Sequence, residues 1–352
     1  MLPKKHTIQK INAIVYKEAI NDIYGRAMHL PCLQKDEGFA MKDSHLRDIT
    51  YLRLSVTDLC DLRCRYCMPA EGVAKRPHQD ICSVEELVEI ARQAVRCGVK
   101  KIRITGGEPL VRRGILDICR GISALDGVTE VCLTTNGTAL SQLAEPLRAS
   151  GVTRLNISLD TLRPERFAYM TRIGRLSDVL AGLEAAGAAG FTGTKLNVVL
   201  MKDFNGDEIP DFVDLTRRYP IEVRFIELMP IGEGKQASFL PASAVLEACP
   251  ELNAADTSGV SRRYRLPDGR GMVGLIEPMS HRFCSQCDRI RVTADGRLKP
   301  CLHSGQEIPL RGLAGEALYQ AICAGIAAKP ASHHMVETGS SDSGRNMNQI
   351  GG

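Results

Sequence analysis

Six short segments of the chain alternate between apolar and polar residues, and most of them precede a stretch with the apolar spacing of a helix. Ser83 and Glu86, for example, have the spacing of a capping box, and Gly98 lies where that helix would end. Repeated strand–helix alternation predicts parallel β–α units, arranged as a doubly wound sheet or as a (β/α) barrel. The predicted strands are 51–57, 101–105, 131–135, 154–159, 195–200 and 222–228, and the predicted helices are 83–97, 114–125, 139–150, 177–190 and 207–219.

The polar positions of these strands distinguish the two arrangements. In the first strand, Leu52 and Leu54 alternate with Arg53 and Ser55, and three later strands repeat this pattern. Strands covered by helices on both faces would be apolar throughout, and a closed eight-strand barrel would fill its interior with branched apolar side chains. We therefore expect an α/β fold with a partial (β/α)6 barrel, whose inner face lines a wide polar cavity for a ligand.

The alternation fades after about residue 230, where the chain becomes rich in Gly and Pro. A short helix is predicted at 242–248, followed by a segment that contains several cysteines. We expect 46–230 to form the barrel, 231–337 to form a C-terminal extension packed against it, and 338–352 to form a flexible tail. Residues 1–45 form an N-terminal extension with a weak pattern, and we assign it no structure.

Composition excludes several classes of protein. The 352 residues include 45 basic and 41 acidic side chains, so the net charge of +4 is too small for nucleic-acid binding by general phosphate neutralisation. An aromatic content of 5% and the lack of a basic stripe point the same way. No apolar run reaches about 18 residues, so we predict no membrane span. Thirteen clustered cysteines, without a signal peptide, indicate reduced thiols for metal binding in a cytoplasmic protein.

Cys60, Cys64 and Cys67 directly follow the first predicted strand. Three thiolates leave one iron of a four-iron cluster without a protein ligand, and that iron can bind a small molecule. The alternative is a structural zinc site, which needs four ligands, and the nearest further candidate along the chain is His78.

Cys284, Cys287 and Cys301 form a second trio, for which zinc and an iron–sulfur cluster are equally open, because His281 or His303 could complete a zinc site. Arg289 and Arg291 follow with one residue between them. On an extended segment both would point toward the trio, where paired guanidinium groups suit a phosphate. The alternative for this pair is a solvent-exposed face.

Gly106 and Gly107 end the second predicted strand, followed by Glu108 and Pro109, on the same rim of the barrel as the first trio. Two glycines allow positive φ and let the backbone approach a ligand closely. Active sites of such barrels lie at this rim, so we expect a ligand contact here, with a plain tight turn as the alternative.

With these residues together, the chain resembles the radical S-adenosylmethionine (SAM) superfamily. Its signature is Cys-x3-Cys-x2-Cys with an aromatic residue before the last cysteine, here Tyr66, followed by Gly-Gly-Glu-Pro. The longer strings at 101–110, 156–160 and 283–291 and the terminal Gly351-Gly352 are similar to the GTP 3′,8-cyclase family, which performs the first step of molybdenum cofactor biosynthesis. The resemblance begins at about Arg47. Leu59, Asp61 and Leu62 depart from it, since the family usually has Arg, Asn and Phe there.

The resemblance implies two [4Fe–4S] clusters with SAM as cofactor. Cys60, Cys64 and Cys67 would hold the first cluster, with SAM on its open iron, and Cys284, Cys287 and Cys301 would hold the second, whose open iron contacts the guanine of GTP. A 5′-deoxyadenosyl radical from SAM would remove hydrogen from C3′ of GTP, and C3′ would then bond to C8. The implied SAM-binding residues are Tyr66, Gly107, Ser158 and Met229, and the implied GTP-binding residues are Arg53, Arg103, Thr134, Lys195, Arg289, Ile290 and Arg291.

The resemblance also implies a homodimer, a partner in the next enzyme of the pathway, and a Gly-Gly tail that enters the active site, and it leaves the electron donor open. Two other readings compete with it. A radical SAM enzyme that modifies a peptide could use the second trio as an electron relay, but it would not need the inward-facing cations. A zinc-ribbon binding protein would use both trios for structural zinc.

Overall fold

The computed structural model describes residues 40–74 and 76–351, and the predicted extension lies outside this part up to residue 39. No helix of the described part has the length and apolar character that would let it cross a membrane. The strands are β1 Tyr51–Ser55, β2 Lys101–Thr105, β3 Glu130–Thr135, β4 Arg154–Ser158, β5 Lys195–Leu200, β6 Glu222–Glu227, β7 Asn253–Ser258, β8 Ser261–Arg265, β9 Met272–Ile276, β10 Arg289–Val292, β11 Arg297–Lys299 and β12 Ile308–Pro309.

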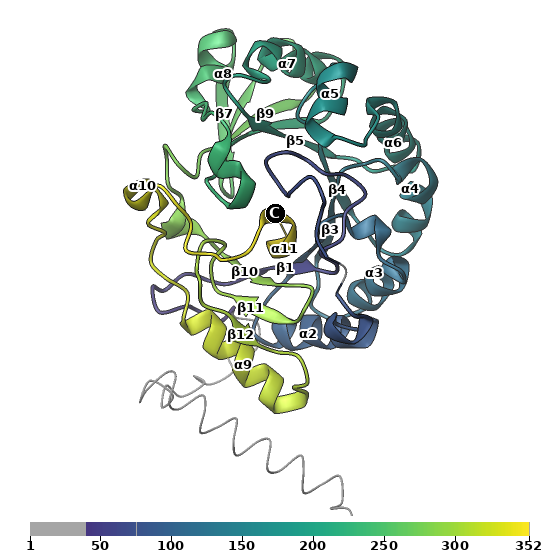
Figure 1. The fold of residues 1–352 in the computed structure, drawn as a ribbon, viewed down its shortest axis with the longest axis vertical. Coiled ribbons are helices and arrows are strands. Elements are labelled where there is room, and N and C mark those ends of the chain that lie inside the picture. The colour runs from purple at the N-terminus through teal and green to yellow at the C-terminus, as the bar shows by residue number, and fades with distance from the viewer. Residues whose placement is uncertain (1–39, 75, 352) are drawn as a thin grey trace, which may run out of the picture. The chain divides into compact units, whose positions relative to one another are not determined.

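These strands form one sheet within the described residues, in the order β12-β11-β10-β1-β2-β3-β4-β5-β6-β9-β8-β7. The six predicted strands, β1 to β6, lie side by side in chain order and are parallel, which confirms the predicted partial barrel. Figure 1 shows the strands as an inner layer with helices outside them. The helices are α2 Val84–Arg96, α3 Ile115–Ser123, α4 Leu140–Ala149, α5 Pro164–Thr171, α6 Leu176–Ala188, α7 Ile209–Arg218, α8 Ser243–Ala248, α9 Gly315–Ala327, α10 Met335–Thr338 and α11 Met347–Ile350.

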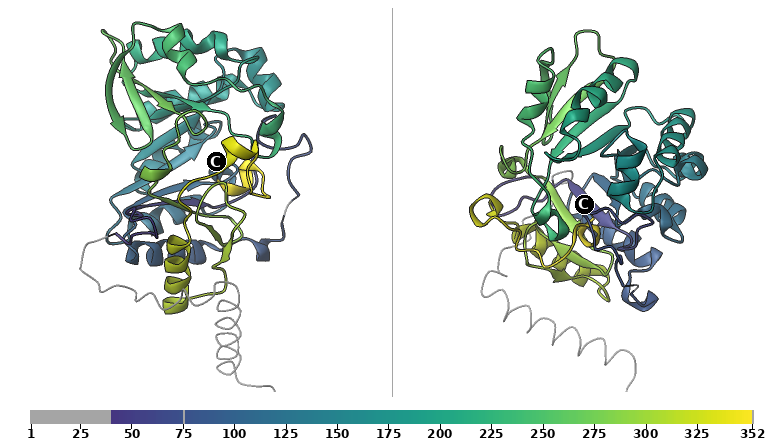
Figure 2. Two further views of the ribbon diagram at one scale, coloured as in Figure 1. Left: turned by 90° about the vertical axis from the view of Figure 1, so that its left-hand side faces the viewer. Right: turned by 45° about the horizontal axis from the view of Figure 1, so that its top comes forward.

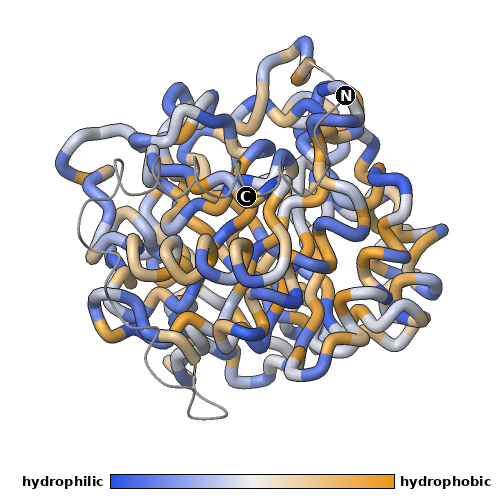
Figure 3. Tube along the Cα trace, turned by 90° about the horizontal axis from the view of Figure 1, so that it is seen from below, coloured by the Kyte–Doolittle hydropathy of each residue, from blue (hydrophilic) through white to orange (hydrophobic). Residues whose placement is uncertain are grey.

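The core lies between the sheet and these outer helices. Leu52, Leu54, Ile102 and Ile104 have no exposed surface, whereas their alternating neighbours face the other side of the sheet. In Figure 3, hydrophobic and hydrophilic stretches alternate along the tube, and the hydrophobic ones are concentrated in the interior. The start of α2 shows why the helices form where the sequence predicts them, because Ser83 and Glu86 make both hydrogen bonds of the capping box.

The C-terminal region does more than pack against the barrel, because it extends the sheet at both ends. β10 pairs parallel with β1, and β9 pairs parallel with β6. This arrangement differs from the prediction of an appended extension, since short strands of four or five residues in a Gly-rich stretch carry little alternation of their own. The sequence also missed α5 and α9, and seven residues of α9 are buried, so its apolar positions do not form one narrow stripe.

The tail differs from the predicted flexible segment. Arg345 donates to Glu307 Oε1 at 2.6 Å and to Asp295 Oδ2 at 3.0 Å. Asn346 and Gln349 then form a capping box that starts α11. Both views in Figure 2 show the yellow C-terminal segment lying against the strands rather than away from them. The composition of this end, rich in Ser and Gly, predicted mobility. Ion pairs between residues about 40 to 50 positions apart hold it in place instead.

Candidate active site

The loop of the first trio and the Gly106-Gly107 turn lie together at the carboxyl ends of β1 and β2. The N–H groups of Gly107 and Glu108 donate to the carbonyls of Thr57 and Leu59, both at 2.8 Å. A Cβ on Gly106 would lie 2.4 Å from the Thr57 carbonyl oxygen, and one on Gly107 would lie 2.3 Å from that of Leu59. Neither glycine has positive φ.

The predicted reason for these two glycines therefore needs correction. They are required because the turn packs directly on the backbone that leads into the first trio, not because of a left-handed conformation. The contact that they permit is one between two loops of the protein, and it fixes the turn relative to Cys60. Sequence reasoning could not see this, because β1 and β2 are 50 residues apart.

The three thiols of the first trio are half-buried and lie close enough to interact electrostatically with one another. Burial raises the pKa of the Cys67 thiol to about 12, although a hydrogen bond from the Asn348 backbone opposes this rise. Burial, with the carboxylates of Glu108 and Asp61, also raises the pKa of Cys60. Thiolates at this position therefore need a bound cation, and a metal cluster with three cysteine ligands matches this donor set.

Residues assigned to SAM by the resemblance surround the same place. Tyr66 donates to Asp160 Oδ2 at 2.8 Å, and a cavity of about 40 Å³ beside them is lined by Cys64 and Ser158 among others. The Met229 and Tyr66 carbonyls both lie within 3.5 Å of where a Cβ on Gly234 would be. Burial raises the pKa of Asp160 to about 6. Asp160 was not predicted as a site residue. The sequence feature that could have identified it is its position two residues after Ser158, on the same side of the alternating pattern.

The second trio has a basic environment. Cys287 donates its backbone N–H to the Cys284 carbonyl at 3.2 Å in a 3₁₀ turn, Cys284–Gln286, and the β10–β11 hairpin returns the chain to Cys301. The Arg291 guanidinium interacts electrostatically with both Cys287 and Cys301. Lys329 Nζ donates to Cys287 Sγ at 3.4 Å and is almost fully buried.

Three thiols with cations around them match the donor set of a second cluster. Outside residues 1–39, 75 and 352, no group of three or more His, Cys, Asp or Glu side chains is arranged to hold one metal ion. A four-iron cluster separates its cysteines more widely than one zinc ion, which brings each sulfur to about 2.3 Å. His281 is exposed, and the ring of His303 packs against that of His333 with 4.8 Å between centroids.

Arginines from adjacent strands lie in one row across the inner face of the sheet. Arg53 of β1 is paired in register with Arg103 of β2 and with Arg291 of β10. Burial and the charge of Arg291 lower the pKa of Arg53, and burial and Arg289 lower the pKa of Arg291 to about 10. Buried like charges in a row are unfavourable without a counter-charge, so this cavity is suited to a polyanion.

The far side of this cavity carries Lys195, which donates to Glu222 Oε2 at 2.6 Å. Burial and the charge of Arg224 lower the pKa of Lys195 to about 8. Thr134 accepts a hydrogen bond from Arg103 Nη1 at 3.2 Å. Arg224 was not among the predicted site residues, although its alternating position on β6 places it on the inner face beside Asn197. Its signal was the strand pattern, not a motif.

Tyr51 is a third residue that sequence reasoning missed, after Asp160 and Arg224. Its hydroxyl accepts a hydrogen bond from Arg103 Nε, and its ring lies 5.2 Å from Lys101 Nζ and 5.4 Å from the Arg289 guanidinium. Burial opposes its ionisation, but the charges of Arg103, Arg53 and Arg289 together outweigh burial and lower the pKa of Tyr51 to about 7. Its alternating position on the first strand was the available signal.

Three predicted residues beside the arginine row have special positions. Arg291 Nη1 and Arg53 Nη2 donate to the Gly351 carbonyl at 2.8 and 3.1 Å, so the tail reaches the arginine row. Ile290 lies between Arg289 and Arg291 but on the opposite face of β10, where its side chain is buried in the core. Any contact of Ile290 with a ligand in the cavity is therefore restricted to its backbone.

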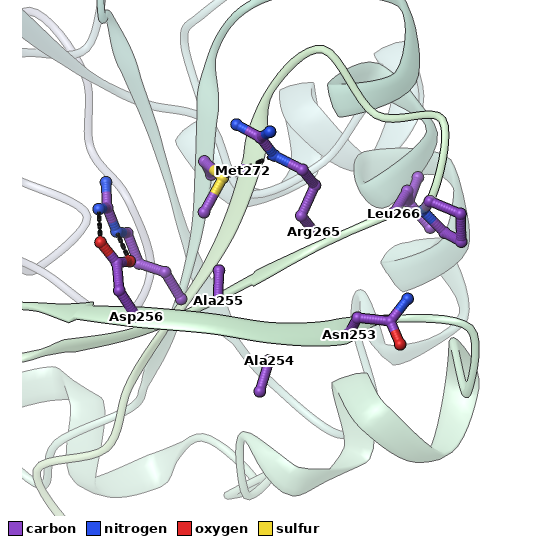
Figure 4. Close-up of a pocket in the computed structure, with 9 residues that line it drawn as sticks. Asn253, Ala254, Ala255, Asp256, Arg265, Leu266 and Met272 are labelled. Atoms are coloured by element: carbon purple, nitrogen blue, oxygen red, sulfur yellow. Dashed lines mark hydrogen bonds and ion pairs between the residues drawn. The ribbon is translucent and has the colours of Figure 1, made fainter.

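A larger groove of about 570 Å³ lies at the β7–β8 hairpin and β9 (Figure 4). It is lined by short side chains and by Asp256, which pairs with Arg263, and by Arg265, which reaches Met272. None of the predicted site residues lines it. Because its charged side chains are engaged with one another, we place the candidate active site at the two trios and the arginine row.

Two family models match most of the chain. Residues 54–216 match the radical SAM superfamily, and residues 221–335 match the molybdenum cofactor synthesis C family. A protein of Moorella thermoacetica named GTP 3′,8-cyclase is 48% identical over 328 residues, and one of Alkaliphilus metalliredigens with the same name is 47% identical over 320 residues. Each match covers 89% of this chain and 100% of the relative.

The solved structures that resemble the chain share its fold at low sequence identity. SuiB of Streptococcus suis, in its complex with S-adenosylmethionine, superimposes with a TM-score of 0.57. The match is 17% identical and covers 79% of this chain and 69% of SuiB. At that identity the similarity supports the partial-barrel fold alone.

Proposed function

The chain belongs to the GTP 3′,8-cyclase family of the radical SAM superfamily, and on this premise we propose which of its residues carry out the reaction. The reaction converts GTP to (8S)-3′,8-cyclo-7,8-dihydroguanosine 5′-triphosphate, the first step of molybdenum cofactor biosynthesis. The observation that carries the assignment of residues is the arginine row, which lies between two thiol trios on the inner face of one sheet. We also propose that the barrel comprises 46–230 and the C-terminal cluster region 231–337.

Cys60, Cys64 and Cys67 would hold a [4Fe–4S] cluster, and Cys284, Cys287 and Cys301 would hold a second one. When bound, the first cluster supplies the electron for reductive cleavage of SAM, which is the source of the radical chemistry. The protein's own contribution is to orient the reactants and exclude water. Support for the first assignment comes from three buried thiols whose ionisation needs a nearby cation.

Tyr66, Gly107, Ser158 and Met229 would position SAM. Tyr66 is itself fixed by Asp160, which also accepts the Val199 N–H at 2.8 Å. The small cavity beside Cys64 and Ser158 lies next to this hydrogen bond. A ligand on the first trio would therefore meet a tyrosine whose orientation is already set.

Arg53, Arg103, Arg289 and Arg291 would bind the nucleotide together with Thr134, Lys195 and the backbone of Ile290. A triphosphate is attracted to this row of guanidinium groups, and each guanidinium can form two parallel hydrogen bonds with it. The fixed cavity would hold C3′ of the ribose near the SAM site and keep the base near the second trio. This arrangement depends on the register of β10, β1 and β2, which places Arg291, Arg53 and Arg103 next to one another.

Gly351 would reach this site near the end of the tail, since its carbonyl already accepts hydrogen bonds from Arg53 and Arg291. The predicted contribution of Gly352 lies outside the described residues. A Cβ on Gly351 would lie 2.6 Å from Thr105 Cγ2, so only glycine fits there. From the family resemblance we further propose a homodimer whose product passes to the next enzyme of the molybdenum cofactor pathway.

The experiment that tests this function is anaerobic reconstitution with iron and sulfide, followed by addition of SAM, a reductant and GTP. We expect 5′-deoxyadenosine to form in a GTP-dependent manner, together with the cyclised nucleotide. ATP in place of GTP serves as the control, since it offers the same triphosphate with another base. Cleavage of SAM that is indifferent to GTP, with a loaded first cluster, would contradict the proposal.

A further inference from the structure

The C-terminal helix α11 contacts the loop of the first trio through one residue, Asn348. Its backbone N–H donates a hydrogen bond to the Cys67 thiol. Its side-chain Nδ2 donates to the carbonyl oxygen of Asp58 at 2.9 Å. Cys67 and Asp58 lie on either end of the first cysteine loop, so Asn348 bridges that loop.

The position of Asn348 is buried and chemically incomplete. The residue is 2% exposed, and within 40–74 and 76–351 its side-chain Oδ1 has no hydrogen-bond partner. A buried amide oxygen without a donor costs free energy, and such atoms are rare in native structures. A molecule that binds beside the first trio can supply this donor.

The neighbours of Asn348 identify that molecule. The Asp58 carbonyl, which holds its Nδ2, lies only 2.7 Å from where a Cβ on Gly107 would be. Gly107 and the cysteine loop are the elements proposed above to surround SAM. Of the groups of SAM, the protonated amino group is a strong donor, and a hydrogen bond to an ionised donor is about twice as strong as a neutral one.

We propose that Asn348 is a positioning residue of the SAM site, which the docked tail completes: its backbone supports Cys67, and its Oδ1 accepts a hydrogen bond from the ammonium group of SAM. This inference rests on the proposed function of the first trio. It assigns to the tail a task separate from that of Gly351, which contacts the arginine row three residues farther on. One short helix thereby touches both halves of the active site.

The test is the affinity of the anaerobically reconstituted holoenzyme for SAM, measured by calorimetry without GTP. Asn348→Ala removes Oδ1, and we expect about tenfold weaker SAM binding, as for loss of one hydrogen bond to a charged group. Asn348→Asp keeps an oxygen acceptor but loses the Nδ2 donor to the Asp58 carbonyl, so we expect it to recover part of the SAM affinity that Asn348→Ala loses. The change that SAM causes in the electron paramagnetic resonance spectrum of the reduced first cluster should be diminished most in Asn348→Ala.

Asn346→Ala is the matched control, because Asn346 caps α11 but contacts neither Cys67 nor Asp58 in the structure. Unchanged SAM affinity in Asn348→Ala would overturn the proposal, and so would an equal loss in Asn346→Ala, which would indicate general loosening of the tail. Alkylation of the cluster-free protein gives a second readout. Because Asn348→Ala keeps the backbone N–H that donates to Cys67, Cys67 should react at about the same rate in Asn348→Ala as in Asn346→Ala, and a much faster reaction would indicate that the tail has undocked. GTP-dependent formation of 5′-deoxyadenosine tests the proposed function separately.

Discussion

The two cysteine trios each offer three thiols, but the charged side chains that act on those thiols differ in sign. Carboxyl groups surround the first trio, where Asp61, Glu108 and Asp160 interact electrostatically with its thiols. Cationic groups surround the second, where Lys329 donates to Cys287 and Arg291 lies near Cys287 and Cys301.

This difference indicates which ligand each trio serves. SAM carries a sulfonium and an ammonium group against one carboxylate, so its net charge is positive and suits the carboxyl-lined trio. GTP is a polyanion and suits the cationic trio. Burial raises the pKa of Glu108 to about 7 and that of Asp160 to about 6, which moderates the negative charge near the first trio when no ligand is bound. We therefore propose that charge directs SAM to the first trio and GTP to the second.

The largest effect is expected from removing each trio separately. Replacing Cys60, Cys64 and Cys67 by Ala should abolish SAM cleavage entirely, because no iron remains to reduce the sulfonium. Replacing Cys284, Cys287 and Cys301 by Ala should leave SAM cleavage in place but abolish its dependence on GTP. Iron analysis should give about eight iron atoms per chain in the unmodified protein and about four in either variant.

Cys82, a buried thiol outside both trios, supplies the control, and its replacement should leave the iron content unchanged. Zinc without acid-labile sulfide at the second trio would contradict the comparison, because it would make that trio a structural site. So would loss of SAM cleavage in both variants, which would indicate that the trios do not have separate tasks.

Arg291 should have the next largest effect, confined to the anionic ligand. Arg291→Ala removes a buried guanidinium from the row and should weaken GTP binding about 10- to 100-fold, the range for hydrogen bonds to charged groups. SAM binding should change much less, because Arg291 reaches the SAM site only through the tail, whose Gly351 carbonyl is also held by Arg53. Anaerobic calorimetry with each ligand measures both effects.

Arg297→Ala is the control on the same hairpin, because Arg297 is 46% exposed and its ion pairs are long, at 3.9 Å. It should leave both affinities unchanged. An equal loss of SAM and GTP affinity in Arg291→Ala would show that the charge of this residue does not discriminate between the two ligands.

Much of this comparison was predictable from the sequence because it depends on short-range patterns. The alternation of Arg53 with Leu52 and Leu54 placed an arginine on the inner face, and the strand register confirms that it lies beside Arg103. The spacing of each trio was also visible locally. What the sequence could not provide was contact between distant segments, such as Arg345 with Asp295, which holds the tail.

The electrostatic contrast between the two trios also depends on contacts between distant segments, so the sequence could not provide it. Lys329 lies 42 positions from Cys287, and Asp160 lies nearly 100 positions from Tyr66, so no motif joins them. Tyr51 and Arg224 were visible as inward positions, yet a strand pattern gives the face of a side chain and not its partner. The predicted reason for Gly107 was wrong for the same cause, since the backbone that it lies against belongs to the loop after another strand.

Tyr51 should make GTP binding depend on pH. Its pKa is lowered to about 7, so above that pH the free protein carries a phenolate among the arginines. A bound triphosphate replaces that negative charge and raises the pKa, so binding takes up a proton, and GTP affinity falls with rising pH by at most about tenfold per unit. Tyr51→Phe keeps the ring and should remove this dependence.

Calorimetry at about pH 8 in two buffers of different ionisation enthalpy measures the proton uptake. The unmodified protein should show a larger buffer dependence of the binding enthalpy than Tyr51→Phe. SAM binding gives the internal comparison. The phenol beside the first trio, Tyr66, has a raised pKa because it is buried, and it is unchanged in Tyr51→Phe, so the buffer dependence for SAM should be the same in both proteins. Equal values for GTP in the two proteins would contradict the prediction.

The smallest expected effect is on the potential of the second cluster, and it comes from Lys329. This ammonium group is 3% exposed and donates to Cys287 Sγ, to the Arg289 carbonyl at 2.8 Å and to the Pro300 carbonyl at 3.1 Å. The positive charge of Lys329 stabilises the reduced form of the cluster. Lys329→Met keeps an unbranched side chain but removes this charge. The reduction potential of the second cluster should therefore fall by less than about 59 mV, a tenfold change in a one-electron equilibrium. Redox titration followed by electron paramagnetic resonance resolves this shift, with the exposed Lys235→Met as control. A shift of the first cluster instead, or of both equally, would mean that the charge around each trio does not act locally.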